Sequence, residues 1–160
     1  MATRGSDWKP SDPRPPTDTH MAQKLLLADD SVTVQRVIEL REAESWVPVG
    51  NCGFHKIDWR NRSAELGIFI GEKSYWSQGY GTEAMRLLLK HGFETLNLNR
   101  IFLRVFNSNL RAIRSYEKAG FIAEGKMRQA EFRRGAYKDV ILMSVLRSEW
   151  DGARGSEPGA

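Results

Sequence analysis

Three consecutive stretches in the first half of the chain have the residue pattern of strands: the first is rich in β-branched residues, and the third alternates before it becomes apolar. They are residues 32–40 (VTVQRVIEL), residues 46–57 and residues 64–70 (AELGIFI). A period of two is typical of half-buried strands, and short polar turns separate these runs. The pattern therefore predicts three strands in an antiparallel meander. Ahead of them, the apolar spacing of residues 21–28 predicts a short amphipathic helix.

The second half of the chain alternates helical and strand patterns. Apolar residues at helical spacing predict a helix over about residues 79–95, and a strand follows at 100–106. Asn109 is a predicted N-cap for the next helix, and Gly120 is its predicted C′ residue. Residues 121–127 and 137–146 are typical of two further strands. A helix joins the strands at 64–70 and 100–106, so we expect these two strands to be parallel.

The summed pattern predicts an α+β fold with a mixed, mostly antiparallel central sheet of about six strands flanked by helices. The length of 160 residues suits one domain, which we place at residues 21–150. Residues 1–20 form a predicted flexible, proline-rich arm, and residues 151–160 a predicted flexible tail.

The composition argues against a membrane protein and against a secreted one. No run approaches the roughly 20 apolar residues of a membrane span, so we expect no membrane partner. The absence of a visible signal sequence and the single cysteine, Cys52, favour a cytoplasmic location. Cys52 lies in a strand-like run and is interpreted as a core residue rather than a nucleophile.

The net charge of +4 raises the question of an anionic partner. Basic residues are interleaved with acidic ones and form no run of five, so we expect no nucleic acid and consider a small polyanion instead. The three histidines are scattered and form no metal-binding spacing, so we expect no metal.

The segment from Tyr75 to Ala84 (YWSQGYGTEA) carries the clearest chemical signal. Gly79 and Gly81 lie between a predicted strand and a predicted helix, where free amide groups favour a phosphate. Plain turn chemistry is an alternative. A dinucleotide fingerprint also fits formally, but it requires an acidic residue at the end of the next strand, and residues 100–106 end without one.

Three segments in this order resemble the GNAT superfamily of acyl-CoA N-acyltransferases, in particular its ribosomal-protein-alanine and spermidine acetyltransferase branch. They are residues 64–70, residues 76–84 (WSQGYGTEA) and residues 109–121 (NLRAIRSYEKAGF). The resemblance covers about residues 22–150. Trp76 departs from the Gln or Arg that usually opens the family's phosphate loop.

The resemblance implies acetyl-CoA as cosubstrate and a set of residues that bind it. Gln78, Gly79, Tyr80, Gly81 and Thr82 would hold the diphosphate through their amide groups. The strand before the loop would pair with the pantetheine arm through Gly67, Ile68, Phe69 and Ile70, and Asn109 would hydrogen-bond the cofactor.

The resemblance also assigns catalytic roles. Tyr116 would donate a proton to the leaving thiolate; simple packing on the apolar helix face is its alternative. Glu65, on the strand that borders the predicted cleft, is the candidate base for the amine, and a solvated strand carboxylate is the alternative.

One departure from the family concerns the N-terminal part, where members usually open with a strand and a helix. This chain has a proline-rich arm instead. Either the sheet lacks its first strand, or the arm or a partner subunit fills the edge, and we expect a homodimer because an unpaired edge favours association. The leading hypothesis is an N-acetyltransferase acting on a primary amine, such as a protein N-terminus, a polyamine or an aminoglycoside-like molecule. A non-catalytic acyl-CoA-binding sensor is the rival.

Overall fold

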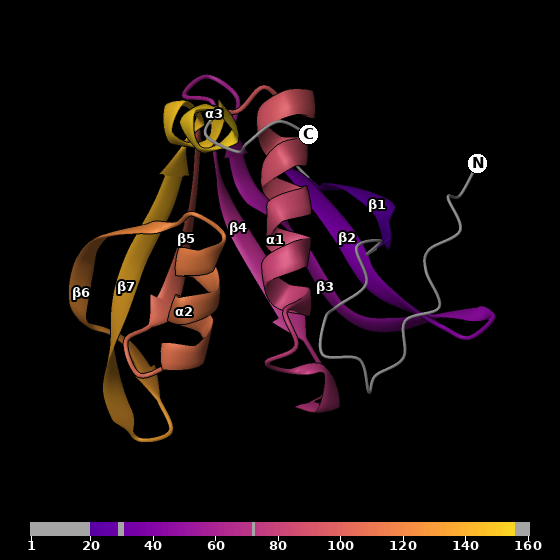
Figure 1. The fold of residues 1–160 in the computed structure, drawn as a ribbon. Coiled ribbons are helices and arrows are strands. Elements are labelled where there is room, and N and C mark those ends of the chain that lie inside the picture. The colour runs from indigo at the N-terminus through magenta and orange to yellow at the C-terminus, as the bar shows by residue number, and fades with distance from the viewer. Residues whose placement is uncertain (1–19, 29–30, 72, 156–160) are drawn as a thin grey trace.

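The computed structural model describes residues 20–28, 31–71 and 73–155 of the chain. The predicted N-terminal arm, apart from His20, lies outside these ranges, as do the last five residues of the predicted tail. The described residues form one sheet with helices packed on it (Figure 1).

The sheet contains seven strands in the order β1-β2-β3-β4-β5-β7-β6. Their bounds are β1 His20–Ala28, β2 Ser31–Glu42, β3 Ser45–Asp58, β4 Ser63–Ile70, β5 Arg100–Phe106, β6 Ile122–Arg133 and β7 Ala136–Leu146. All neighbours are antiparallel except β4 and β5, which are parallel as the helical connection predicts. The predicted fold class is confirmed, with one strand more than the six that the pattern indicates.

The additional strand is β1, where the sequence pattern predicts a helix over residues 21–28. That prediction is wrong. The backbone of β1 pairs with β2 from His20 opposite Glu39 to Ala28 opposite Ser31. A run of nine residues with a few apolar positions does not distinguish a helix from a strand. Pairing with a long neighbouring strand overrides its weak helical preference.

The helices follow the predicted order. They are η1 Lys73–Tyr75, α1 Tyr80–Lys90, η2 His91–Thr95, α2 Leu110–Lys118 and α3 Arg147–Gly155. The predicted helix over 79–95 is therefore α1 followed by η2, a π-helical turn. Helix α3 was not predicted, and it extends into the segment expected to be a flexible tail.

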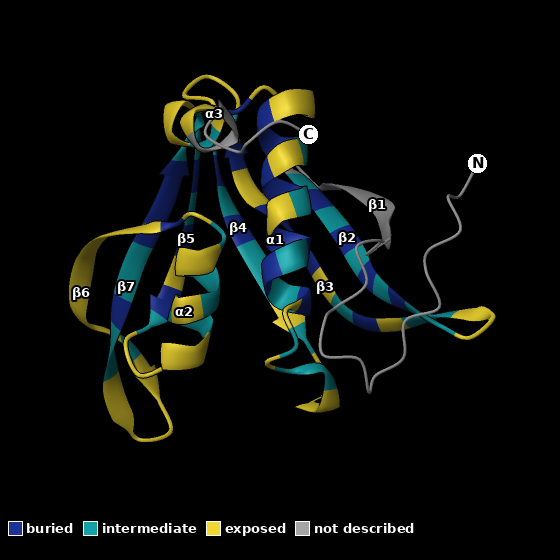
Figure 2. Cartoon of the chain, in the orientation of Figure 1, coloured by how far each residue is buried: buried dark blue, intermediate teal, exposed yellow. Residues whose placement is uncertain are grey.

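The core lies between the sheet and the helices α1 and α2, which cover the same face of the sheet (Figures 1 and 2). The inward face of α1 is fully buried and packs on strands β2 to β5; it consists of Tyr80, Ala84, Met85, Leu88 and Leu89. Gly92 allows the chain after α1 to approach the sheet closely. A Cβ atom there would lie 2.7 Å from Ile101 Cδ1 and 2.8 Å from Phe54 Cζ.

Strands β4 and β5 are the one pair in the sheet that separates early. Only Ser63, Ala64 and Glu65 of β4 pair with β5, opposite Arg100, Ile101 and Phe102. The two strands then diverge, as Figure 1 shows. Helices α1 and α2 both begin at the open end of this split. The fold therefore brings two helix starts and a free strand backbone to one place.

Candidate active site

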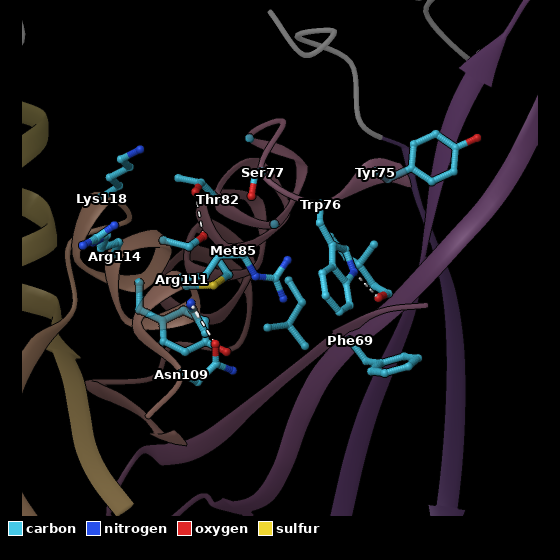
Figure 3. A pocket seen from close by; sticks show the side chains of 17 residues that line it. Phe69, Tyr75, Trp76, Ser77, Thr82, Met85, Asn109, Arg111, Arg114 and Lys118 are labelled. Atoms are coloured by element: carbon cyan, nitrogen blue, oxygen red, sulfur yellow. Dashed lines mark hydrogen bonds between the residues drawn. The ribbon is translucent and has the colours of Figure 1, made fainter. Parts of the chain in front are cut away.

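A cavity of about 510 Å³ lies at the open end of the β4–β5 split. The end of β4, the loop before α1, the first turns of α1 and one face of α2 line it (Figure 3). Its lining residues are Ile68, Phe69, Ile70, Tyr75, Trp76, Ser77, Gly79, Gly81, Thr82, Met85, Asn109, Arg111, Ala112, Arg114, Ser115, Tyr116 and Lys118.

The start of α1 faces this cavity, and Gly79, Gly81 and Thr82 belong to its lining. Gly79 precedes the helix with φ 86°, a left-handed conformation that glycine adopts without strain, and no side chain caps the helix. The first backbone hydrogen bond of the helix runs from Glu83 N–H to the Gly79 carbonyl at 3.0 Å. The N–H groups of Gly81 and Thr82, which line the cavity, precede this bond. A helix start of this kind attracts an anion.

Helix α2 forms the opposite wall. Its N-cap is Asn109, as predicted, and the side-chain oxygen of Asn109 accepts a hydrogen bond from Ala112 N–H at 3.2 Å. The hydroxyl oxygens of Thr82 and Ser115 lie 2.8 Å apart and join the first turn of α1 to α2. One turn further along α1, Arg86 Nη2 donates to the Lys118 carbonyl at 3.2 Å. These contacts hold the two helices side by side.

The lining of the cavity is cationic. Arg111, Arg114 and Lys118 all belong to it, and none of the 17 lining residues is acidic. Trp76 stands beside Arg111, whose guanidinium carbon lies 3.8 Å from the centre of the indole ring. The Trp76 indole N–H donates to the Ile70 carbonyl at 2.9 Å, which ties the loop to the end of β4. The cavity is therefore suited to an anionic ligand.

Tyr116 lines the cavity from α2 and packs partly against the core, with its ring 6.1 Å from that of Phe121. Burial raises the pKa of the phenol above its ordinary value, and the charge of Arg111 acts in the opposite direction. A phenol with a raised pKa stays protonated at neutral pH and can donate a proton.

The structure brings together most of the residues predicted to bind a cofactor. Ile68, Phe69, Ile70, Gly79, Gly81, Thr82, Asn109 and Tyr116 all line the cavity. Tyr80 instead points into the core and is fully buried. The Gln78 side chain turns back to donate to the Ser74 carbonyl. Gly67 lies outside the lining, where its missing side chain makes room for His55, whose Nε2 would be 2.7 Å from a Cβ atom.

Glu65, the predicted base, also lies outside the lining of the cavity, at the point where β4 leaves β5. Its carboxylate accepts a hydrogen bond from Arg104 Nε at 2.6 Å, and Lys56 Nζ is 3.6 Å away. The bond to Glu65 raises the pKa of Arg104. The structure thus presents Glu65 as an ion-paired carboxylate beside the split, and its catalytic role stays a prediction.

Sequence reasoning missed the polar face of α2. Arg111, Arg114, Ser115 and Lys118 are spaced i, i+3, i+4 and i+7, which places them on one helix face. This periodicity was available in the sequence. The apolar face of the same helix gives a stronger signal, which indicates core packing.

A family model described as the acetyltransferase (GNAT) domain matches residues 3–122. The chain belongs to the GNAT acetyltransferase family. The family resemblance predicted from the sequence is thereby confirmed.

Two relatives and one solved structure illustrate the relationship of this GNAT chain to known members. It is 38% identical over 104 residues to the uncharacterized N-acetyltransferase p20 of Bacillus licheniformis, covering 65% of the chain and 58% of the relative. It is 34% identical over 95 residues to a spermidine N(1)-acetyltransferase of Vibrio cholerae, covering 59% of the chain and 54% of the relative. The chain thus spans little more than half the length of these relatives.

The solved structure is that of spermidine N-acetyltransferase from Vibrio cholerae in complex with CoA and spermine. It matches this GNAT chain with a TM-score of 0.68 and 30% identity, over 74% of this chain and 68% of that one. Among the described residues, no helix has both the length and the apolar character to cross a membrane. In the same part of the chain, no three His, Cys, Asp or Glu residues are grouped to hold a metal ion.

Proposed function

We propose that this protein is an acetyl-CoA-dependent N-acetyltransferase that acts on a primary amine. The observation that carries the proposal is the cavity at the β4–β5 split, which combines the uncapped start of α1, a cationic lining and the phenol of Tyr116. Membership of the GNAT family and the similarity to a structure that holds CoA support it.

The residues of the cavity fit the chemistry of CoA. A diphosphate is an anion, and the amide groups at the start of α1 together with the nearby cations form a site for one. The last residues of β4 line the cavity without pairing to β5, so their backbone groups can pair with the amides of a pantetheine arm. Alternate residues of β4 direct their backbone groups to β3, and the Ile70 carbonyl already accepts from Trp76, which leaves Ile68 and the Ile70 N–H for this pairing.

Acetyl-CoA supplies the acetyl group as a thioester. A neutral amine attacks its carbonyl carbon, the new C–N bond forms, the C–S bond breaks, and the thiolate needs a proton. Tyr116 is positioned to donate that proton, because its phenol lines the cavity and its raised pKa keeps it protonated. Glu65, directly or through water, is the candidate that accepts the proton of the amine. Its ion pair with Arg104 is then part of the catalytic geometry.

The acceptor is proposed at the level of a primary amine. A polyamine is one candidate, since spermine is present in the matched solved structure, and a protein N-terminus and an aminoglycoside-like molecule are the others. A homodimer also stays a prediction. Strand β6 supports it, because it is an edge strand of 12 residues of which all but Glu131 are exposed (Figure 2). A cytoplasmic location likewise stays a prediction.

The proposal is tested by calorimetric titration with acetyl-CoA and CoA, followed by an assay of free-thiol release with a panel of amines. We expect binding of both ligands and thiol release that depends on the amine. Binding without amine-dependent release would favour the sensor hypothesis. Absence of binding to both ligands would overturn the assignment of the cavity.

A further inference from the structure

Among the described residues, neither Arg111 nor Arg114 of the cavity lining forms an ion pair with a carboxylate. Elsewhere in the described chain, Arg100, Arg104, Arg133 and Arg147 each form an ion pair with a carboxylate. Within residues 20–28, 31–71 and 73–155, no such pair involves Arg111. Its positive charge therefore faces a cavity whose lining offers nothing to neutralise it.

The position of Arg111 is nevertheless fixed. Its guanidinium carbon lies 3.8 Å above the centre of the Trp76 ring, a contact distance for cation–π stacking. Trp76 is itself held, since its indole N–H donates to the Ile70 carbonyl at 2.9 Å. Figure 3 shows Arg111 directed toward Trp76 across the cavity. Two successive contacts thus tie a cation of α2 to the loop that leads into α1.

Stacking leaves the guanidinium ready to bind an anion. A planar guanidinium that lies flat on an aromatic ring keeps its N–H groups at the edge, where they can form two parallel bonds to phosphate oxygens. Because the side chain is already held, little conformational entropy is lost when the anion binds. Trp76 lies three residues before Gly79, so this cation belongs to the same loop region as the amide groups of Gly81 and Thr82 at the start of α1.

Arg114 and Lys118 are placed differently. Each lies further along α2, and the distance from residue 111 to residue 118 is about 10 Å at the rise of an α-helix. Figure 3 shows Arg114 and Lys118 beside each other and away from Trp76. Among the described residues, no aromatic ring stacks on Arg114 or Lys118. They are therefore cations of the same helix face with which Arg111 can be compared.

We propose that Arg111, held on the ring of Trp76, binds the diphosphate of acyl-CoA together with the amide groups at the start of α1. The inference rests on the proposed function and deepens it. Trp76 is a positioning residue in this arrangement, and Arg111 makes the contact. Besides its own Lys73, whose Nζ lies 5.8 Å from the centre of the Trp76 ring, the loop thus obtains a positive charge from α2.

The test compares the Kd values of acetyl-CoA and of 3′-dephospho-acetyl-CoA for the wild-type protein, Arg111→Ala and Arg114→Ala. Thermal melts establish that each variant is folded. We expect Arg111→Ala to weaken both ligands by the same factor, about tenfold to a hundredfold for the loss of charge-assisted hydrogen bonds. Arg114→Ala is expected to weaken the dephospho ligand less than Arg111→Ala does.

A second pair of variants tests the role of the ring. Trp76→Ala should weaken binding less than Arg111→Ala does, and the double variant should bind no more weakly than Arg111→Ala alone. In the variant Trp76→Arg/Arg111→Ala, the loop regains a cation at its own position, and we expect part of the lost affinity to return.

The outcomes distinguish failure of the proposed function from failure of the assignment of Arg111 to the diphosphate. A wild-type protein that binds neither ligand overturns the proposed function and this inference with it. Wild-type binding that Arg111→Ala leaves unchanged overturns the inference alone. A loss confined to the ligand with the 3′-phosphate also overturns it, because Arg111 would then contact that phosphate instead of the diphosphate.

Discussion

The hydroxyl oxygens of Thr82 and Ser115 lie 2.8 Å apart and connect α1 to α2 at the wall of the cavity. Both residues belong to the lining, and Thr82 is buried. The two helices come from different parts of the chain, so this contact fixes the width of the site at the level of the α1 start.

We expect Thr82→Val and Ser115→Ala each to lower the free energy of unfolding by about 1 kcal/mol, the usual net value of one hydrogen bond. The double variant should lose less than the sum of the two. Urea denaturation of the four proteins measures this coupling. Additive losses would show that the contact contributes nothing to holding the helices together.

Tyr116→Phe removes the phenol and keeps the ring that packs near Phe121. If the phenol protonates the leaving thiolate, kcat should fall by about a hundredfold or more, while the Kd for acetyl-CoA stays within about twofold. Thiol-release kinetics and calorimetry measure the two quantities. An unchanged kcat would assign Tyr116 to packing alone.

Glu65→Gln tests the candidate base. The substitution keeps the size of the side chain and removes its charge, so we expect a large loss of kcat with amine acceptors. Because Arg104 is 44% exposed, loss of the ion pair should change the free energy of unfolding by less than about 1 kcal/mol. The variant Arg104→Gln is the control for the ion pair. Activity that depends on Arg104 and not on Glu65 would contradict the base assignment.

His91 makes the stability of the fold depend on pH. The Nη2 atom of the buried Arg36 lies 2.8 Å from His91 Nε2. Burial lowers the pKa of His91 in the folded state, and the charge of Arg36 lowers it further. The unfolded chain therefore binds more protons, so the stability contributed by neutral His91 is complete above the unfolded pKa of 6.5.

This stability is lost as the pH falls below that value. We expect the melting temperature of the wild-type protein to drop between pH 7.5 and 5.5 by more than that of His91→Gln, which cannot gain a proton there. Thermal melts of both proteins across this range measure the difference. Equal drops in the two proteins would assign the pH dependence to other groups.

Cys52 is the only cysteine of the chain and lies buried in β3. Burial raises the pKa of its thiol to about 12, although the charge of Arg36 acts against this shift. A thiol with so high a pKa reacts slowly, because the thiolate is the nucleophile. We expect no reaction with a disulfide reagent in the native protein and one equivalent of thiol after denaturation. Rapid labelling of the native protein would contradict the burial of Cys52.

The sequence pattern correctly predicted the strands and helices that line the site. Strand β5 matched residue for residue, and the cap residues Asn109 and Gly120 were found where local chemistry required them. Such elements are determined by local signals, which a pattern can detect. Strand β1 was missed because its conformation depends on pairing with β2, which is a tertiary contact.

Helix α3 was missed for a related reason. Its sequence, RSEWDGARG, has little apolar periodicity, and Trp150 packs on Phe93, a residue 57 positions earlier, with the ring centres 5.3 Å apart. At the site, the glycine loop was visible because φ > 0 at Gly79 has a sequence signature. The contact between Trp76 and Arg111 has no such signature, since it joins two elements that only the fold brings together.

The short pairing between β4 and β5 divides the sheet into two blocks. One contains β1, β2, β3 and β4, and the other contains β5, β7 and β6. Three residue pairs join the blocks through the sheet, whereas seven pairs join β5 to β7. Helix α1 with the packing beneath it, and contacts such as the ion pair of Glu65 with Arg104, also join the two blocks. A molecule that fills the split would act as a brace between the blocks, so its binding free energy would also resist their separation during unfolding.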